Sequence, residues 1–194
     1  MFVDYLTLML LNMAVALVLF AWFMALGFEK NQKRFVPGFL LTGFIGLVTG
    51  LHMTFRWPLP GSFNIMFGEP TVLLGGFFFV AGLALLLGWD LLTIGLYALF
   101  GGAAVVLLGV RILNMHLTQE PIVAALGYFL TGATAIATFP ALALPSWKWL
   151  RWLVALAALG SAVIWIIVGF PSYWAHMEAF GKWAPPTMLP APPK

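Results

Sequence analysis

Six long apolar stretches, separated by short polar or proline-containing breaks, constrain this chain more than any other feature. A helix of about 20 apolar residues crosses the hydrocarbon core of a bilayer. Six segments qualify, at roughly 4–28, 36–55, 70–89, 91–113, 121–144 and 149–171. Only 8% of the residues are charged and 63% are hydrophobic, whereas soluble domains carry about 25% charged residues. The sequence therefore predicts an all-α integral membrane protein whose six transmembrane helices form three consecutive hairpins.

The breaks between the stretches carry residues that end helices. The sequence Glu29 to Arg34 separates the first two stretches, and Pro58, Pro60 and Gly61 open a loop after the second. The last twelve residues contain five prolines and no apolar period, which predicts an extended or disordered tail. We expect one six-helix domain over 1–182 and a Pro-rich tail over 183–194. The first stretch is too long for a signal peptide and is interpreted as a retained span.

Basic residues in short loops predict the orientation of such a protein, because they are retained on the cytoplasmic side. One predicted side holds Lys30, Lys33, Arg34, Lys148 and Arg151, and the other holds Arg56, Arg111, Lys182 and Lys194. The first loop usually dominates, so we expect a multi-pass protein of the cell membrane with both termini extracytoplasmic. The net charge of +3 is explained by this rule and implies no nucleic-acid partner.

Histidines and carboxylates gather on the predicted extracytoplasmic side, each beside the end of an apolar stretch. Both side chains bind transition metals, and histidine also binds haem iron. We therefore expect a metal or haem site at that end of the bundle, acting in redox chemistry or electron transfer. The expected metal ligands are His52, His116, His176, Glu69 and Glu120.

Other polar residues on this side would bind the cofactor or an anionic substrate. The expected cofactor-binding residues are Arg56, Arg111, Asn64 and Tyr173. A spacing of four puts His52 and Arg56 on one helix face, which suits a haem iron and its propionate. A mixed His and carboxylate set favours iron, manganese or zinc, with copper also open, whereas two histidines with arginines favour haem b. The absence of cysteine excludes disulfides, iron–sulfur clusters and thioether-attached haem. The protein would then be a membrane metallo- or haem oxidoreductase.

Two other interpretations stay open. Carboxylates at helix starts and arginines at helix ends complement the helix dipole without any ligand. In that case the protein is a structural or accessory subunit of a membrane complex, or a homo-oligomer, without its own cofactor. Alternatively, it is an uncoupled carrier for a small neutral solute, because no Asp, Glu, Lys or Arg is placed near the middle of the bilayer.

A weak internal repeat indicates duplication. Glu69-Pro70-Thr71-Val72 resembles Glu120-Pro121-Ile122-Val123, 51 residues later. Proline is favoured in the first turn of a helix. The repeat therefore predicts duplicated helix starts at these two positions.

The segment TFRWPLPGSFNIMFGEP, over residues 54–70, resembles a hallmark of a family of prokaryotic integral membrane proteins, domain of unknown function 981. The segments LTLMLLNM at 6–13 and LTQEP at 117–121 are similar to the same family. The resemblance covers most of the chain except the Pro-rich tail. It supplies no activity and implies a single six-span domain from bacteria or archaea.

Overall fold

The computed structural model describes residues 5–183, which form helices joined by turns, with no strand among them. α1 (Leu6–Trp22) continues into the π-helical turn η1 (Phe23–Gly27). The 3-10 turn η2 (Gln32–Phe35) leads into α2 (Val36–Arg56), and the π-helical turn η3 (Asn64–Gly68) leads into α3 (Glu69–Leu87). α4 (Leu92–Met115), α5 (Pro121–Ala143) and α6 (Lys148–Ala179) complete the fold. The proposed tail begins at Trp183, so all but its first residue lies outside the described part.

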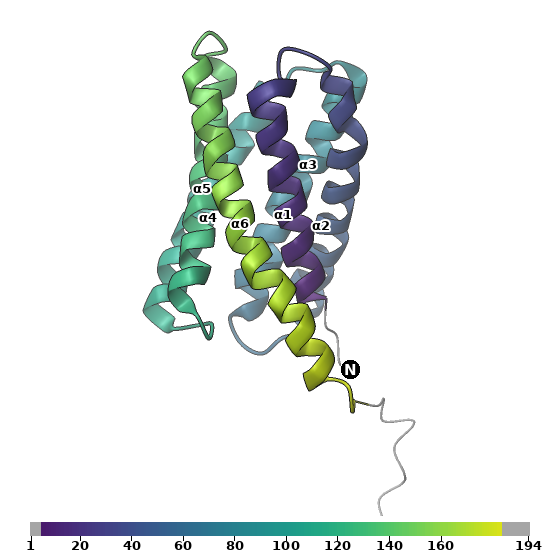
Figure 1. Ribbon diagram of the computed structural model, residues 1–194, viewed down its shortest axis with the longest axis vertical. Helices are drawn as coiled ribbons and strands as arrows, with labels where there is room; N and C mark the ends of the chain where they lie inside the picture. Colours follow the sequence, from purple (N-terminus) through teal and green to yellow (C-terminus); the bar gives the residue numbers. More distant parts are fainter. Residues whose placement is uncertain (1–4, 184–194) are drawn as a thin grey trace, which may run out of the picture.

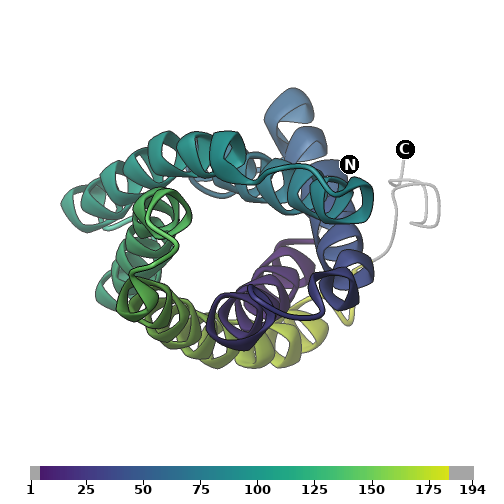
Figure 2. The ribbon, with the colours of Figure 1, turned by 90° about the horizontal axis from the view of Figure 1, so that it is seen from above.

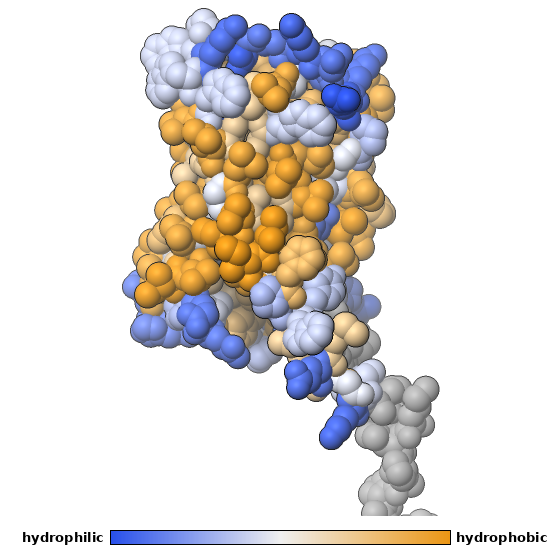
Figure 3. All heavy atoms as spheres, viewed as in Figure 1, coloured by the Kyte–Doolittle hydropathy of each residue, from blue (hydrophilic) through white to orange (hydrophobic). Residues whose placement is uncertain are grey.

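The six predicted spans are confirmed as helices long and apolar enough to cross a bilayer. Apolar side chains cover the middle of the molecule and polar ones gather at its two ends (Figure 3). Exposed tryptophans stand near the ends, as in the aromatic belts of membrane proteins; they are Trp22, Trp57, Trp89, Trp147, Trp149, Trp152, Trp174 and Trp183. The architecture is that of a multi-pass membrane protein.

Two helical segments extend further than the sequence predicted. α6 continues through Pro171 to Ala179 and is 32 residues long. Helical turns also begin at Asn64, inside the segment expected to be a loop. A proline near the end of a long helix and a π-helical turn are both irregularities that hydropathy alone does not indicate.

The helices form a ring in chain order, which closes where α6 packs against α1 (Figures 1 and 2). The most extensive interfaces join α2 to α3 and α4 to α5, and among neighbours in the ring α3 meets α4 least. Helices alternate in direction, so the same ends recur around the ring. We call the end where α1, α3 and α5 begin the histidine end, and the opposite end the lysine end.

Glycines set the close approach of α2 and α3. A Cβ at Gly43 would lie 2.2 Å from the backbone nitrogen of Phe79, and one at Gly75 would lie 2.6 Å from that of Leu47. Small residues let helix backbones approach closely in a membrane, where packing rather than the hydrophobic effect drives association. The backbones of α2 and α3 are therefore in direct contact, and we call such an interface locked.

The same packing recurs between α4 and α5. A Cβ at Gly102 would lie 2.8 Å from the nitrogen of Ile136, and one at Gly132 would lie 2.8 Å from the carbonyl oxygen of Gly102. Gly43 thus corresponds to Gly102, 59 residues later, and Gly75 to Gly132, 57 residues later. The packing repeats between the two hairpins.

The spacing of this packing repeat differs from the 51-residue spacing of the Glu-Pro motif in the sequence. Pro70 and Pro121 both stand in the first turn of an α-helix, as expected. However, the turn η3 precedes α3, so the packing offset of 57 pairs Asn64 with Pro121, and not Glu69 with Glu120. The matching Glu-Pro motifs therefore do not occupy equivalent positions in the two hairpins.

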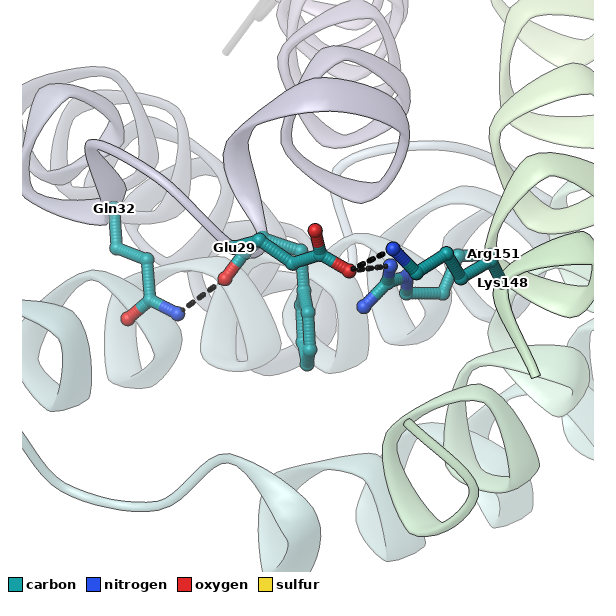
Figure 4. A network of polar contacts seen from close by, with 5 residues as sticks. Glu29, Gln32, Lys148 and Arg151 are labelled. Atoms are coloured by element: carbon teal, nitrogen blue, oxygen red, sulfur yellow. Dashed lines mark hydrogen bonds and ion pairs between the residues drawn. The ribbon is translucent and has the colours of Figure 1, made fainter. Parts of the chain in front are cut away.

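A buried arginine helps to close the ring at the lysine end (Figure 4). Arg151 of α6 donates from Nη2 to Oε1 of Glu29 at 2.6 Å, and its guanidinium lies 4.7 Å from the Phe28 ring centre. Lys148 Nζ is 3.3 Å from the same carboxylate oxygen. Hydrogen bonds from Arg151 and then Lys148 lower the pKa of the Glu29 carboxyl below its usual range. From the sequence, Lys148 and Arg151 were used only to predict the orientation in the membrane, and their ion pairs with Glu29 were not predicted.

Candidate ligand-binding cleft

The fold places the residues singled out in the sequence at the histidine end, but the described part does not gather them into one metal site. His52 lies in the penultimate turn of α2, His116 caps the C-terminus of α4, and His176 lies in the last turn of α6. Within residues 5–183, no three His, Asp or Glu side chains come close enough together to hold a metal ion. The expected set of His52, His116, His176, Glu69 and Glu120 therefore stays a prediction.

His52 makes one specific contact with the start of the neighbouring helix of the ring, α1. The Tyr5 hydroxyl lies 2.8 Å from His52 Nδ1, and the two rings meet edge to face with centres 5.4 Å apart. Burial raises the pKa of Tyr5, so its hydroxyl stays protonated. The hydrogen bond joins the start of α1 to the end of α2 and fixes the orientation of the imidazole.

Three of the expected cofactor-binding residues, Arg56, Arg111 and Tyr173, have exposed side chains. Arg111 donates to Met115 Sδ at 3.2 Å. His116 adopts a left-handed conformation with φ 50° and is exposed as well. Their placement at one end agrees with the expectation, and binding of a cofactor by them remains a prediction.

Asn64 is fully buried, and its amide holds the preceding loop. Its Oδ1 accepts a hydrogen bond from the nitrogen of Leu59 at 2.9 Å, while Nδ2 donates to the carbonyl oxygens of Leu59 and Gly61. These hydrogen bonds hold the loop that contains Pro58, Pro60 and Gly61. Both ends of the amide are occupied by this backbone.

Tyr128 is buried in the interior of the ring near the histidine end. Pro70 has no N–H to give to the carbonyl oxygen of Met66, four residues earlier. The buried hydroxyl of Tyr128 donates to that oxygen instead. Its ring also meets that of Trp165 edge to face, with centres 5.5 Å apart. Tyr128 was not among the site residues predicted from the sequence.

Three threonines continue this polar line along the inner face of α5. Thr131, Thr134 and Thr138 are buried, and each hydroxyl donates to the carbonyl four residues earlier at 2.8 Å. Thr131 also accepts from Trp165 Nε1 at 3.0 Å. Among the described residues, Thr134 and Thr138 have no further side-chain partner, so each oxygen keeps a lone pair that can accept a hydrogen bond.

These threonines line a narrow cleft between α1, α3, α4 and α5. Its cavity volume is about 30 Å³, measured as the space open to the centre of a water molecule. Its walls are apolar and aromatic apart from the α5 hydroxyls and Tyr97, and no charged side chain is among them. The lining residues used below are Leu73, Phe77, Tyr97, Gly101, Thr134 and Thr138. Ligand pockets commonly combine such apolar walls with a few polar groups.

The cleft reaches the outer surface of the ring between α3 and α4. Tyr97 lines it and is 47% exposed. A Cβ at Gly101 would meet nothing closer than the Leu73 Cβ at 3.9 Å, so the helices are not locked at this level. Two adjacent glycines of α4 differ in their surroundings. Gly102 packs closely against α5, whereas Gly101 leaves space in the wall of the cleft.

Comparison with known proteins supports the family resemblance carried by the loop and the helix starts. No curated protein and no solved structure matched the chain. Residues 1–179 match a family model described as Protein of unknown function (DUF981). The match covers the six helices through Ala179. The chain belongs to the DUF981 family.

Proposed function

We propose that this protein binds an uncharged, lipid-soluble molecule in the cleft between α1, α3, α4 and α5. The observation that supports the proposal is the chemistry of the walls, which present aromatic and aliphatic side chains and no charge. A charged ligand would lose its hydration there without a counter-ion. An apolar ligand loses nothing, because the walls resemble the lipid it comes from.

The polar groups of the cleft narrow the class of ligand. The hydroxyls of Thr134 and Thr138 already donate to backbone oxygens and can only accept further hydrogen bonds. Phe77 and Tyr97 offer ring contacts beside them. This arrangement suits a planar ring that carries a hydroxyl group, with an apolar tail in the surrounding lipid.

A simple phenol with an alkyl tail tests the proposal. We expect 4-octylphenol to raise the unfolding temperature of the detergent-purified protein more than octylbenzene, which lacks the hydroxyl. Saturation to a hundred times the dissociation constant corresponds to about 2.7 kcal/mol. For a chain of this size, that free energy amounts to a rise of roughly 5–11 °C.

Two glycine variants localise the binding. Gly101→Leu fills the cleft from a position where a Cβ meets no close neighbour, and it should abolish the shift. Gly76→Leu is the matched control: its Cβ would meet only Leu47 Cδ2 at 3.8 Å, and it is not part of the cleft wall. Equal shifts with both compounds, or loss of the shift in both variants, would contradict the proposal.

A metal or haem site at the histidine end is the second candidate, supported by the contact between Tyr5 and His52. Metal-binding histidines commonly have their other ring nitrogen fixed by a hydrogen bond. Elemental analysis and an absorption spectrum of the purified protein test this candidate. We expect a Soret band or near-stoichiometric metal that is lost in His52→Ala, and a colourless, metal-free protein would refute it.

A further inference from the structure

We infer that the ligand enters and leaves the cleft sideways from the bilayer, through the seam between α3 and α4. We define this seam by Leu73, Tyr97 and Gly101. The inference rests on the proposed function and adds the route to it. It follows from three features around the cleft: two interfaces in close backbone contact, a looser interface between them, and packed side chains toward both ends.

The interfaces on either side of the seam are locked by backbone contact. A Cβ at Gly43 would lie 2.2 Å from α3, and one at Gly102 would lie 2.6 Å from the carbonyl oxygen of Gly132 on α5. Separating these helices would break an extended set of close contacts. The hairpins α2–α3 and α4–α5 therefore move as units.

The seam between the hairpins lacks such contacts. Its Leu73 Cβ and the Cβ position of Gly101 are 3.9 Å apart, an ordinary van der Waals distance between side chains. Tyr97, partly exposed, stands at the mouth. Separating α3 from α4 at the seam breaks only contacts between side chains and no close backbone contacts. It should therefore cost less free energy than separating α2 from α3 or α4 from α5.

Packed side chains narrow the cleft toward its two ends. Toward the lysine end, phenylalanine rings from α1, α2 and α3 contact one another, with Phe20 and Phe77 5.6 Å apart and Phe39 and Phe78 5.4 Å apart between ring centres. Toward the histidine end stands Tyr128, hydrogen-bonded to Met66. A route along the axis would have to displace these groups, whereas the seam already faces lipid.

A reversible cross-link tests the route directly. The chain has no cysteine, so a double variant, Leu73→Cys with Gly101→Cys, introduces the only pair. The 3.9 Å between their Cβ positions falls within the range of about 3.5–4.5 Å found in disulfides. A second pair, Leu10→Cys with Gly169→Cys, joins α1 to α6 across 3.5 Å and serves as the control.

Each double variant is placed in lipid nanodiscs, loaded with tritiated 4-octylphenol in the reduced state, oxidised, and chased with unlabelled compound. We expect oxidation of the seam pair to slow release at least tenfold and reduction to restore it, with little effect of the control pair. An unchanged release rate, or equal slowing by both disulfides, would overturn the lateral route. Absence of binding to the wild-type protein in the same nanodiscs would instead refute the proposed function.

A single substitution gives an independent readout without a disulfide. Tyr97→Ala removes the side chain at the mouth of the seam, together with one ring contact of the cleft wall, and should speed both binding and release. Phe44→Ala, at a 57% exposed position on α2 away from the cleft, is the control. Slower or unchanged exchange in Tyr97→Ala would contradict the inference.

Discussion

Two adjacent glycines of α3, Gly75 and Gly76, should respond oppositely to the same substitution. A Cβ at Gly75 would lie 2.6 Å from the nitrogen of Leu47 and 2.7 Å from the carbonyl carbon of Gly46, both in the backbone of α2. Comfortable contact needs about 3.5 Å, so Gly75→Ala forces α2 and α3 apart by roughly 1 Å. At Gly76 the nearest atom is Leu47 Cδ2 at 3.8 Å, and a methyl group fits.

The two free energies follow from these distances. Overpacking costs about 1–3 kcal/mol, and alanine recovers about 1 kcal/mol of helix propensity over glycine. Gly75→Ala should therefore lose about 0–2 kcal/mol, with a central value of about 1 kcal/mol. Gly76→Ala should gain about 0.5–1 kcal/mol, because it receives the propensity without the clash. The difference of about 2 kcal/mol corresponds to roughly 4–8 °C in unfolding temperature.

Thermal unfolding followed by circular dichroism in one detergent measures this difference. Both substitutions add the same methyl group to the same helix, so effects of the micelle and of α3 itself cancel between them. Equal shifts, or a larger loss in Gly76→Ala, would refute the view that backbone contact locks α2 to α3.

Three further predictions concern single polar groups. Because the pKa of Glu29 is lowered in the folded state, its ion pair stabilises the protein at neutral pH. Glu29→Gln should melt below the wild type at pH 7, and the gap should start to close as the pH falls below the ordinary value of 4.5; a gap that widens in acid would contradict this sign. Tyr128→Phe leaves the Met66 carbonyl without its hydroxyl partner and should cost about 1–3 kcal/mol in denaturant unfolding, and an unchanged midpoint would rule the bond out as a stabiliser. Asn64→Ala frees the loop before η3 and should speed its cleavage by protease, whereas Asn114→Ala, at an exposed position, should not.

The sequence predicts the number, order and approximate limits of the helices, because apolar length alone decides whether a segment can span a bilayer. Alternating direction then places His52, His116 and His176 at one end without further information. The inward face of each helix is harder to predict. Lipid is as apolar as the interior of the bundle, so hydrophobicity does not separate Leu73 in the cleft from Phe44 on the surface.

The sequence also could not separate neighbouring residues with opposite roles. Gly101 and Gly102 are adjacent, yet one leaves space in the cleft and the other locks α4 to α5. Arg151 resembles any basic residue near a helix start until α1 brings Glu29 to it. The spacing of Thr131, Thr134 and Thr138 was the one available signal for the cleft, because these positions share a helix face.

The contact between the first and last helices has a consequence for biogenesis. Glu29 and Arg151 are 122 residues apart, and α1 finds its partner α6 only when nearly the whole chain has been made. During synthesis the hairpins α2–α3 and α4–α5 are complete before α6 leaves the ribosome. Until then, the side of α1 that will face α6 is covered by lipid or by the insertion machinery. The arrival of α6 is thus the step that turns an open row of helices into a closed ring.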